Sequence, residues 1–193
     1  MLASRTARTA ARSRRGATVV EGALVMSVFL MLLFGMFEYC RFLMVLHVTN
    51  NAARDGARYA SVNLDKPASF NRTDFTDAGG TVYTNVEVYT TARLGGTQKQ
   101  LNNYKVACFA VDPTGLTLPT LVVRPKTKSA ASPKVYPDPF ATSDPNAVPW
   151  NTAVFTEKIA VTIQGDYIPV LPALLQMPAS IPVKVTAIMG SEG

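Results

Sequence analysis

An uninterrupted apolar segment near the N-terminus is the strongest constraint in this sequence. Residues 17–37 read ATVVEGALVMSVFLMLLFGMF, and Glu21 is their one charged residue. This length matches the ~20 residues that a helix needs to cross the hydrocarbon core of a bilayer. No proline occurs before Pro67, so nothing breaks a helix that continues outside the membrane. We therefore predict a transmembrane helix over residues 17–37 and its extension outside the membrane over 38–62.

The basic residues that precede the apolar segment indicate its orientation. Residues 1–16 hold five of the 19 Lys and Arg residues and no acid, which leaves 14 basic against 13 acidic residues elsewhere. Five of the six net positive charges thus lie in a short leader. No nucleic acid partner is expected, because such a surface needs a basic stripe on the folded domain. The positive-inside rule predicts a cytoplasmic leader and places the rest of the chain outside.

This N-terminal segment has three interpretations. A secretory signal peptide has a shorter apolar core and a small-residue cleavage site, whereas Glu38-Tyr39-Cys40-Arg41 follows here. A plain signal anchor fits the length and the charge. The third interpretation depends on Glu21, because a carboxylate in a membrane helix costs on the order of a few kcal/mol. No basic residue lies between Arg15 and Arg41 to pair with it, although it could also snorkel to the lipid headgroups.

Cleavage after Gly16 would supply a partner charge. Ala17 would then be the new N-terminus and Glu21 the fifth residue. This arrangement resembles type IV prepilins, in which a dedicated membrane peptidase cuts on the cytoplasmic side and the apolar helix is retained. The resemblance implies that the new amine of one subunit neutralises the glutamate of its neighbour as the subunits assemble.

Three sequence elements, in order, resemble the TadE-like family of the Tad/Flp pilus machinery. The similarity covers about residues 14–62. The first element surrounds the cleavage point, the second has the pattern Gly-x-x-Glu-x-x-Arg, and the third has the pattern Asn-Ala-Ala-Arg-x-Gly-Ala-Arg. The residues that carry it are Gly16, Ala17 and Glu21, then Gly35, Glu38 and Arg41, and then Asn51, Ala52, Ala53, Arg54, Gly56, Ala57 and Arg58.

Several of these residues also have a physical role that follows from helical spacing. Glu38 and Arg41 are three residues apart and can pair on one face just outside the bilayer. Gly35 is a position where we expect the helix to bend as it leaves the membrane. A face of small residues follows and allows another element to approach closely: Ala52, Ala53, Gly56, Ala57 and Ala60. Arg54 and Arg58 lie mainly on other faces, either solvated or paired with the outer domain.

Residues 63–193 are predicted to form one exported α+β domain. Residues 81–94 alternate as a strand would but also show a helical face, and we favour a helix because the resembled family usually has one here. A proline-rich loop is expected at about 124–150. Its Lys126, Lys128 and Lys134 are either solvated, which we favour, or part of an electrostatic contact. Strands are predicted over 104–111, 116–123, 153–163 and 181–189.

The last two predicted strands suggest an antiparallel hairpin. Their connection is very apolar, so we expect it near the membrane, the long helix or a partner subunit. The fold class is therefore α+β and pilin-like, with a long N-terminal transmembrane helix that continues outside the membrane and packs on a small antiparallel β-sheet.

The sequence shows no pattern typical of a catalytic or metal-binding site. It has no catalytic motif and one histidine, so we predict neither an enzyme nor a cofactor or metal site. Cys40 and Cys108 would both face an oxidising compartment, which allows a disulfide between them.

The resemblance implies a structural component of the bacterial Tad/Flp pilus, a minor pseudopilin of the inner membrane that supports pilus assembly or initiation and so adhesion. Its expected partners are other pilins or pseudopilins, the prepilin peptidase, the inner-membrane assembly platform and the lipid bilayer. The alternative is a single-pass membrane-anchored envelope protein whose outer domain binds a surface ligand and whose helix is only an anchor.

Overall fold

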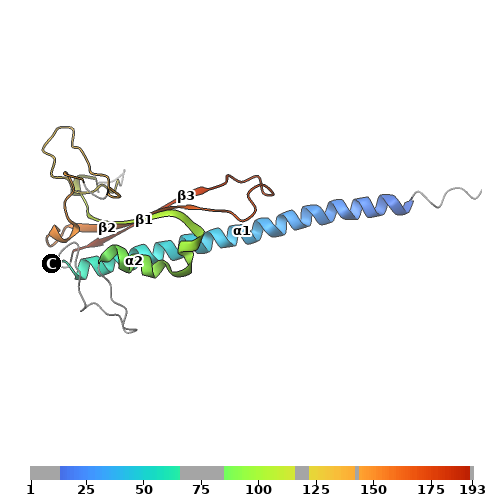
Figure 1. Ribbon diagram of the computed structural model, residues 1–193, viewed down its shortest axis with the longest axis horizontal. Coiled ribbons are helices and arrows are strands. Elements are labelled where there is room, and N and C mark those ends of the chain that lie inside the picture. The colour runs from blue at the N-terminus through green and yellow to red at the C-terminus, as the bar shows by residue number, and fades with distance from the viewer. Residues whose placement is uncertain (1–13, 66–84, 116–121, 142–143, 192–193) are drawn as a thin grey trace, which may run out of the picture.

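One long helix dominates the structure. The computed structural model describes residues 14–65, 85–115, 122–141 and 144–191. Helix α1 (Arg14–Val62) is continuous over 49 residues, or about 73 Å at 1.5 Å per residue. Its N-terminal half stands alone, and its C-terminal half lies against the rest of the chain (Figure 1). The predicted long helix is confirmed, but α1 passes through Gly35 without a break, so the bend expected there is absent.

A three-stranded antiparallel sheet forms the body of the outer domain. Its order is β1-β2-β3, with β1 at Leu101–Ala110, β2 at Lys158–Tyr167 and β3 at Ile181–Gly190. β2 and β3 pair without interruption over their full length, as expected for a hairpin. The three corresponding predicted strands are confirmed within a few residues, and the predicted strand at 116–123 lies mostly outside the described residues.

The segment with ambiguous periodicity is a helix where the structure describes it. α2 spans Val86–Leu94. The Asn85 side chain accepts a hydrogen bond from the backbone N–H of Val88 at 2.7 Å, which caps the helix start. Gly95 follows the helix with φ of 54°, a backbone conformation that favours glycine. The Asn85 cap and the glycine at the C-terminal end favour a helix, although the residues between them include β-branched ones.

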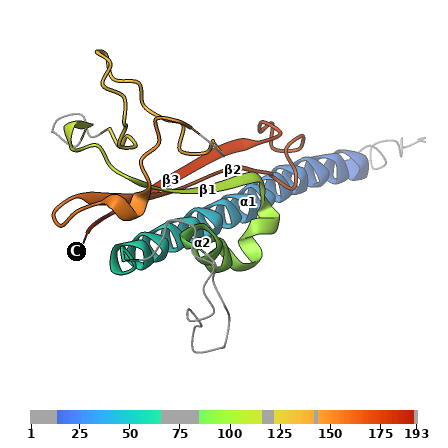
Figure 2. The same ribbon diagram turned by 60° about the vertical axis from the view of Figure 1, so that its left-hand side comes forward.

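The outer domain has its sheet between two coverings. α1 and α2 lie on one face, and the proline-rich segment lies on the other (Figure 2). The small-residue face of α1 packs inward as predicted: Ala52, Ala53, Ala57 and Ala60 are each at most 1% exposed. The opposite face of the sheet carries a smaller cluster around Phe109 that packs against Val123 and Phe140.

Two ion pairs hold the proline-rich segment to the sheet. Lys126 Nζ lies 2.6 Å from Glu157 Oε1, and Lys134 Nζ lies 2.9 Å from Asp112 Oδ2. Lys126 and Lys134 therefore make electrostatic contacts, the less favoured of the two expectations, although the Lys134 side chain is still 45% exposed. Burial alone would raise the pKa of the Asp112 carboxyl, but hydrogen bonds from Thr114 and Lys134 lower that pKa to about 2. The segment is thus fastened to the sheet edge at neutral pH.

The disulfide that the sequence allowed is not formed. Cys40 and Cys108 are both free. Cys108 packs against the cluster that contains Ala57, and Ala57 lies 17 residues after Cys40 on the same helix, or about 25 Å along its axis. A disulfide needs Cα atoms within about 7 Å. The two thiols are too far apart because they lie at opposite ends of the packed half of α1.

Gly56 of α1 packs directly against Thr90 of α2, so a larger residue at this position should lower stability. A Cβ atom added at Gly56 would overlap Thr90 Oγ1 and lie 3.1 Å from Thr90 Cβ, and Thr90 is fully buried. We expect Gly56→Ala to lower the free energy of unfolding by about 1–3 kcal/mol through overpacking, although alanine favours helix formation by up to about 1 kcal/mol. Thermal unfolding of the full chain in detergent, followed by circular dichroism, measures this change.

Gly35→Ala is the matched control on the same helix. A Cβ there meets only Leu175 Cδ2, at an ordinary contact distance of 3.7 Å, so this variant should unfold at or above the wild-type temperature. Thr90→Ala should restore part of the stability that Gly56→Ala loses, because it removes the overlapping hydroxyl. Equal melting temperatures for Gly56→Ala and the wild type would contradict the packing argument.

Candidate functional site on the long helix

The free half of α1 exposes a continuous apolar surface. Every side chain from residue 16 to residue 32 is exposed, among them Val19 at 72% and Leu24 at 64%. The helix is long and apolar enough to cross a membrane. An apolar surface of this extent is unfavourable in water, so lipid or neighbouring helices must cover it. This half of α1 is the first part of the candidate site.

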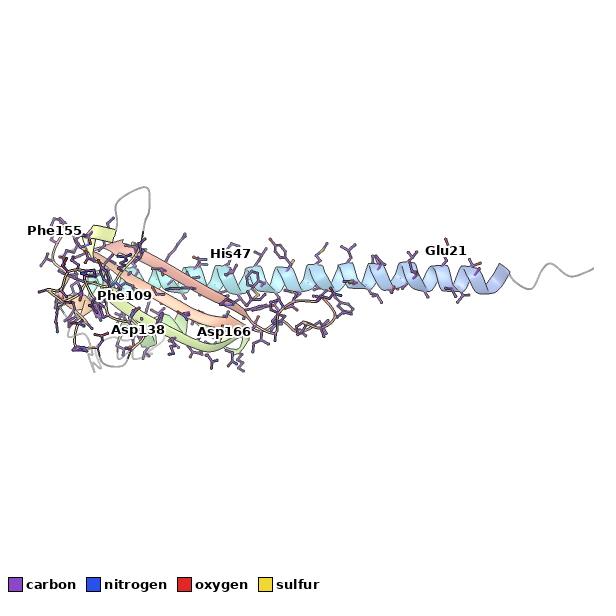
Figure 3. The ribbon with its side chains drawn as sticks, turned by 90° about the horizontal axis from the view of Figure 1, so that it is seen from above. Glu21, His47, Phe109, Asp138, Phe155 and Asp166 are labelled. Atoms are coloured by element: carbon purple, nitrogen blue, oxygen red, sulfur yellow. The ribbon has the colours of Figure 1, made fainter. Side chains whose placement is uncertain are left out.

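Glu21 is the one acidic residue on this apolar surface. It lies near the N-terminal end of α1 (Figure 3), and it forms no ion pair with any other residue that the structure describes. Gly22 beside it leaves a shallow groove, which Thr18, Val25 and Phe29 also line. The structure thus places the carboxylate next to a notch that a second helix could fill. Gly16 and Ala17, the predicted cleavage position, lie in the first turn of the same helix.

Glu38 marks the point where α1 changes from exposed to packed. It is only 6% exposed. Its Oε1 accepts a short hydrogen bond from the Tyr167 hydroxyl, and its Oε2 accepts one from the backbone N–H of Val170 at 3.2 Å. Sequence spacing predicted a pair with Arg41 at the surface, and Arg41 does lie 3.7 Å away. The prediction was incomplete, because the principal partners of Glu38 are on the β2–β3 hairpin.

Arg41 connects the same region to a third segment. Its Nε donates to Gln100 Oε1 at 3.1 Å, just before β1. Its guanidinium carbon lies 5.5 Å from the centre of the Tyr167 ring, and Phe42 contacts that ring edge-on at 5.3 Å between centroids. Tyr167 is fully buried, and its three contacts on α1 lie within little more than one helical turn. We call Glu38, Arg41, Tyr167 and the Val170 N–H the Glu38 junction.

Burial and the neighbouring carboxylate both disfavour a tyrosinate at this junction. Burial, and then the hydrogen bond to Glu38, raise the pKa of Tyr167 to about 12. The hydroxyl therefore stays protonated and donates to Glu38 throughout the physiological range. The sequence did not reveal Tyr167, because nothing in a strand pattern says which buried tyrosine meets a helix residue 129 positions earlier.

The third sequence element divides between packing and surface. Ala52, Ala53, Gly56 and Ala57 are buried, whereas Asn51, Arg54 and Arg58 are exposed. The buried members set the distance between α1 and the outer domain, as the Thr90 contact shows. The exposed members lie on the side of α1 that remains available to other molecules.

The contacts of the Glu38 junction predict that a substitution at Tyr167 lowers the stability of the fold. Tyr167→Phe keeps the ring contacts but leaves a buried carboxylate oxygen without its hydroxyl donor, so we expect a loss of about 1–3 kcal/mol in the free energy of unfolding near pH 7. Because the raised pKa of Tyr167 favours its neutral form in the fold, its stabilising contribution is complete below pH 10 and is lost as the pH rises from 10 to about 12. Unfolding measured against pH should show a steeper alkaline decline in the wild type than in the variant.

Tyr39→Phe serves as the control for this experiment. Tyr39 is the residue after Glu38 on the same helix, but its side chain is 61% exposed. The Tyr39→Phe substitution removes one exposed hydroxyl and should leave the free energy of unfolding within about 0.5 kcal/mol of the wild type. A Tyr167→Phe protein as stable as Tyr39→Phe would show that the hydrogen bond from the Tyr167 hydroxyl to Glu38 contributes nothing to stability.

Comparisons with known proteins support the sequence interpretation of α1. A family model described as TadE-like protein matches residues 16–58, under a quarter of the 193 residues. No curated protein and no solved structure matches the chain. The matched range contains Glu21, Glu38 and Gly56, and it ends before the hairpin that carries Tyr167. The resemblance to the TadE-like family is therefore confirmed over residues 16–58, and the helix that carries it is long and apolar enough to cross a membrane.

Proposed function

We propose that this protein is a structural, non-enzymatic pilin-like component of the Tad/Flp pilus, a minor pseudopilin that supports pilus assembly or initiation and through it adhesion. The observation that carries the proposal is the free half of α1, an exposed apolar helix with one carboxylate, rigidly continuous with a folded outer domain. A helix of this kind can leave lipid and pack among other helices without unfolding the domain. A simple anchor needs neither the carboxylate nor the continuity.

Glu21 is the proposed assembly contact. In a membrane its charge lacks a partner among the described residues of its own chain, and an unpaired charge there is unfavourable. Removal of the leader after Gly16 by the prepilin peptidase would create a positively charged amine at Ala17. That amine on a neighbouring pilin, brought close in the groove beside Gly22, would neutralise the carboxylate. Assembly would then be favoured over the separate subunits in the inner membrane.

The proposed function implies a topology. The leader would remain in the cytoplasm, and the outer domain would lie in the periplasm or, after assembly, on a surface pilus. The inner-membrane assembly platform would act on the free half of α1 and on the exposed residues Asn51, Arg54 and Arg58. The bilayer would cover the apolar surface until assembly.

A substitution at Glu21 tests the assembly contact. We expect Glu21→Gln to reduce incorporation into pili, or pilus number, by tenfold or more, because about 1.4 kcal/mol of lost pairing corresponds to one factor of ten. The amount in the inner membrane should stay unchanged, since glutamine keeps the length and apolar character of the helix. Immunoblots of sheared pili and of membrane fractions measure both quantities.

Asp55→Asn is the matched control, an equal loss of one charge at an exposed position on the packed half of α1. It should leave both quantities at wild-type levels. Normal piliation by Glu21→Gln would refute the assembly role, and loss of membrane localisation by this variant would show that the glutamate acts in insertion instead.

A substitution at Gly16 tests maturation independently. We expect the native protein to begin at Ala17, and Gly16→Val to retain the leader, because a branched side chain would obstruct the peptidase at the scissile bond. Intact-mass measurement of the protein purified from its native membranes distinguishes the two forms. A wild-type protein that keeps residues 1–16 in cells with an active prepilin peptidase would favour the alternative, a single-pass anchor for a ligand-binding outer domain.

A further inference from the structure

The connection between β2 and β3 has an unusual composition for an exposed loop. It runs from residue 168 to residue 180, and no charged residue occurs between Asp166 and Lys184. Three of its apolar side chains are largely exposed: Ile168 at 43%, Val170 at 61% and Leu174 at 49%. The proline-rich segment, by contrast, carries lysines and aspartates. A loop that exposes apolar side chains with no charge among them is suited to a non-aqueous surface.

The loop lies beside the apolar half of α1 and points along it. The Val170 N–H meets Glu38, and Leu175 lies against Gly35, three residues nearer the N-terminus of α1. From Val170 to Leu175 the loop thus advances by about 4.5 Å along the axis of α1 toward its N-terminus. Figures 1 and 3 show the connection extending beyond the sheet toward the free half of α1. Gly35 belongs to the last turn of the apolar segment.

The loop also has few backbone N–H groups that would be left unpaired away from water. Pro169, Pro172 and Pro178 have no N–H group to leave unsatisfied. Within the loop, the Leu175 N–H donates to the Leu171 carbonyl at 3.2 Å and the Met177 N–H donates to the Pro172 carbonyl at 2.9 Å. Unpaired backbone groups are costly away from water, and these features reduce their number.

We propose that the β2–β3 connection is a second membrane contact, which rests in the headgroup region of the bilayer beside the point where α1 emerges. Lipid is favoured as the partner because the loop continues the apolar surface of α1 at the depth where that surface ends. The Glu38 junction holds the loop at this depth, so two points of contact fix the orientation of the outer domain on the membrane. A single helix alone would leave the domain free to rotate and tilt.

Fluorescence quenching by brominated lipid tests this proposal in the full chain. The protein is reconstituted into vesicles of phosphatidylethanolamine and phosphatidylglycerol, with and without phosphatidylcholine brominated at carbons 6 and 7. Leu174→Trp should lose about half of its added emission in the brominated vesicles, as expected for a side chain at the boundary of headgroups and acyl chains. The native Trp150 is buried and gives a constant background.

Two control variants make the result decisive. Phe155→Trp places the probe at an equally apolar and 69% exposed position at the far end of the outer domain (Figure 3), and it should show no quenching. Phe29→Trp places it in the middle of the apolar segment and should be strongly quenched. Val170→Trp replaces Leu174→Trp if that variant folds poorly by circular dichroism.

The outcomes separate this inference from the proposed function. Quenching of Leu174→Trp well above that of Phe155→Trp supports the second contact. Quenching of Phe29→Trp alone overturns it while leaving the membrane-spanning helix intact, as would be seen if the loop served as a contact between copies of the chain. Absence of quenching in all three variants would overturn both the loop contact and membrane insertion of α1.

Discussion

The structure depends on one helix that changes its surroundings midway without changing its geometry. α1 is continuous from Arg14 to Val62, exposed over its first half and packed over its second. Glu38 lies where the two halves meet. A buried carboxylate is favourable only when it is well hydrogen-bonded, and the Tyr167 hydroxyl and the Val170 N–H provide those bonds. The position of the hairpin relative to the apolar segment follows from this junction.

Close packing farther along α1 makes the connection between helix and domain rigid. The small residues of the third sequence element bring α1 against α2 and the sheet, and a Cβ atom at Gly56 would overlap Thr90. Cores packed in this way transmit displacement with little deformation. A force applied to the free half of α1 would therefore move the outer domain as one body, which is what a subunit drawn from a membrane into an assembly requires.

Much of the fold could be predicted from the sequence because its signals were local. The length and polarity of residues 17–37, the absence of early proline, and the alternation in the last two strands gave the helix and the hairpin. The ends of α2 were set by Asn85 and Gly95 rather than by the periodicity between them. The continuity of α1 was predicted, but the bend expected at Gly35 is absent, because a glycine in a helix is compatible both with a bend and with a close contact such as that of Leu175.

The candidate site was only partly predictable, since its contacts join distant parts of the chain. The motif around Glu38 and Arg41 was visible, but Tyr167 and Gln100 are separated from it by 129 and 59 positions. The pairing of Lys134 with Asp112 was hidden for the same reason, and so was the separation of Cys40 from Cys108. Glu21 was evident from the sequence, and its proposed partner lies on another molecule.

The account rests on a charge pair between subunits, and zero-length carbodiimide cross-linking of native pili or membranes tests it most directly. It predicts a cross-linked peptide that joins the Glu21 carboxylate to the N-terminal amine of a neighbouring pilin, identified by mass spectrometry. A Glu21 that stays unlinked in assembled material, on a chain whose own N-terminus still carries the basic leader, would contradict it.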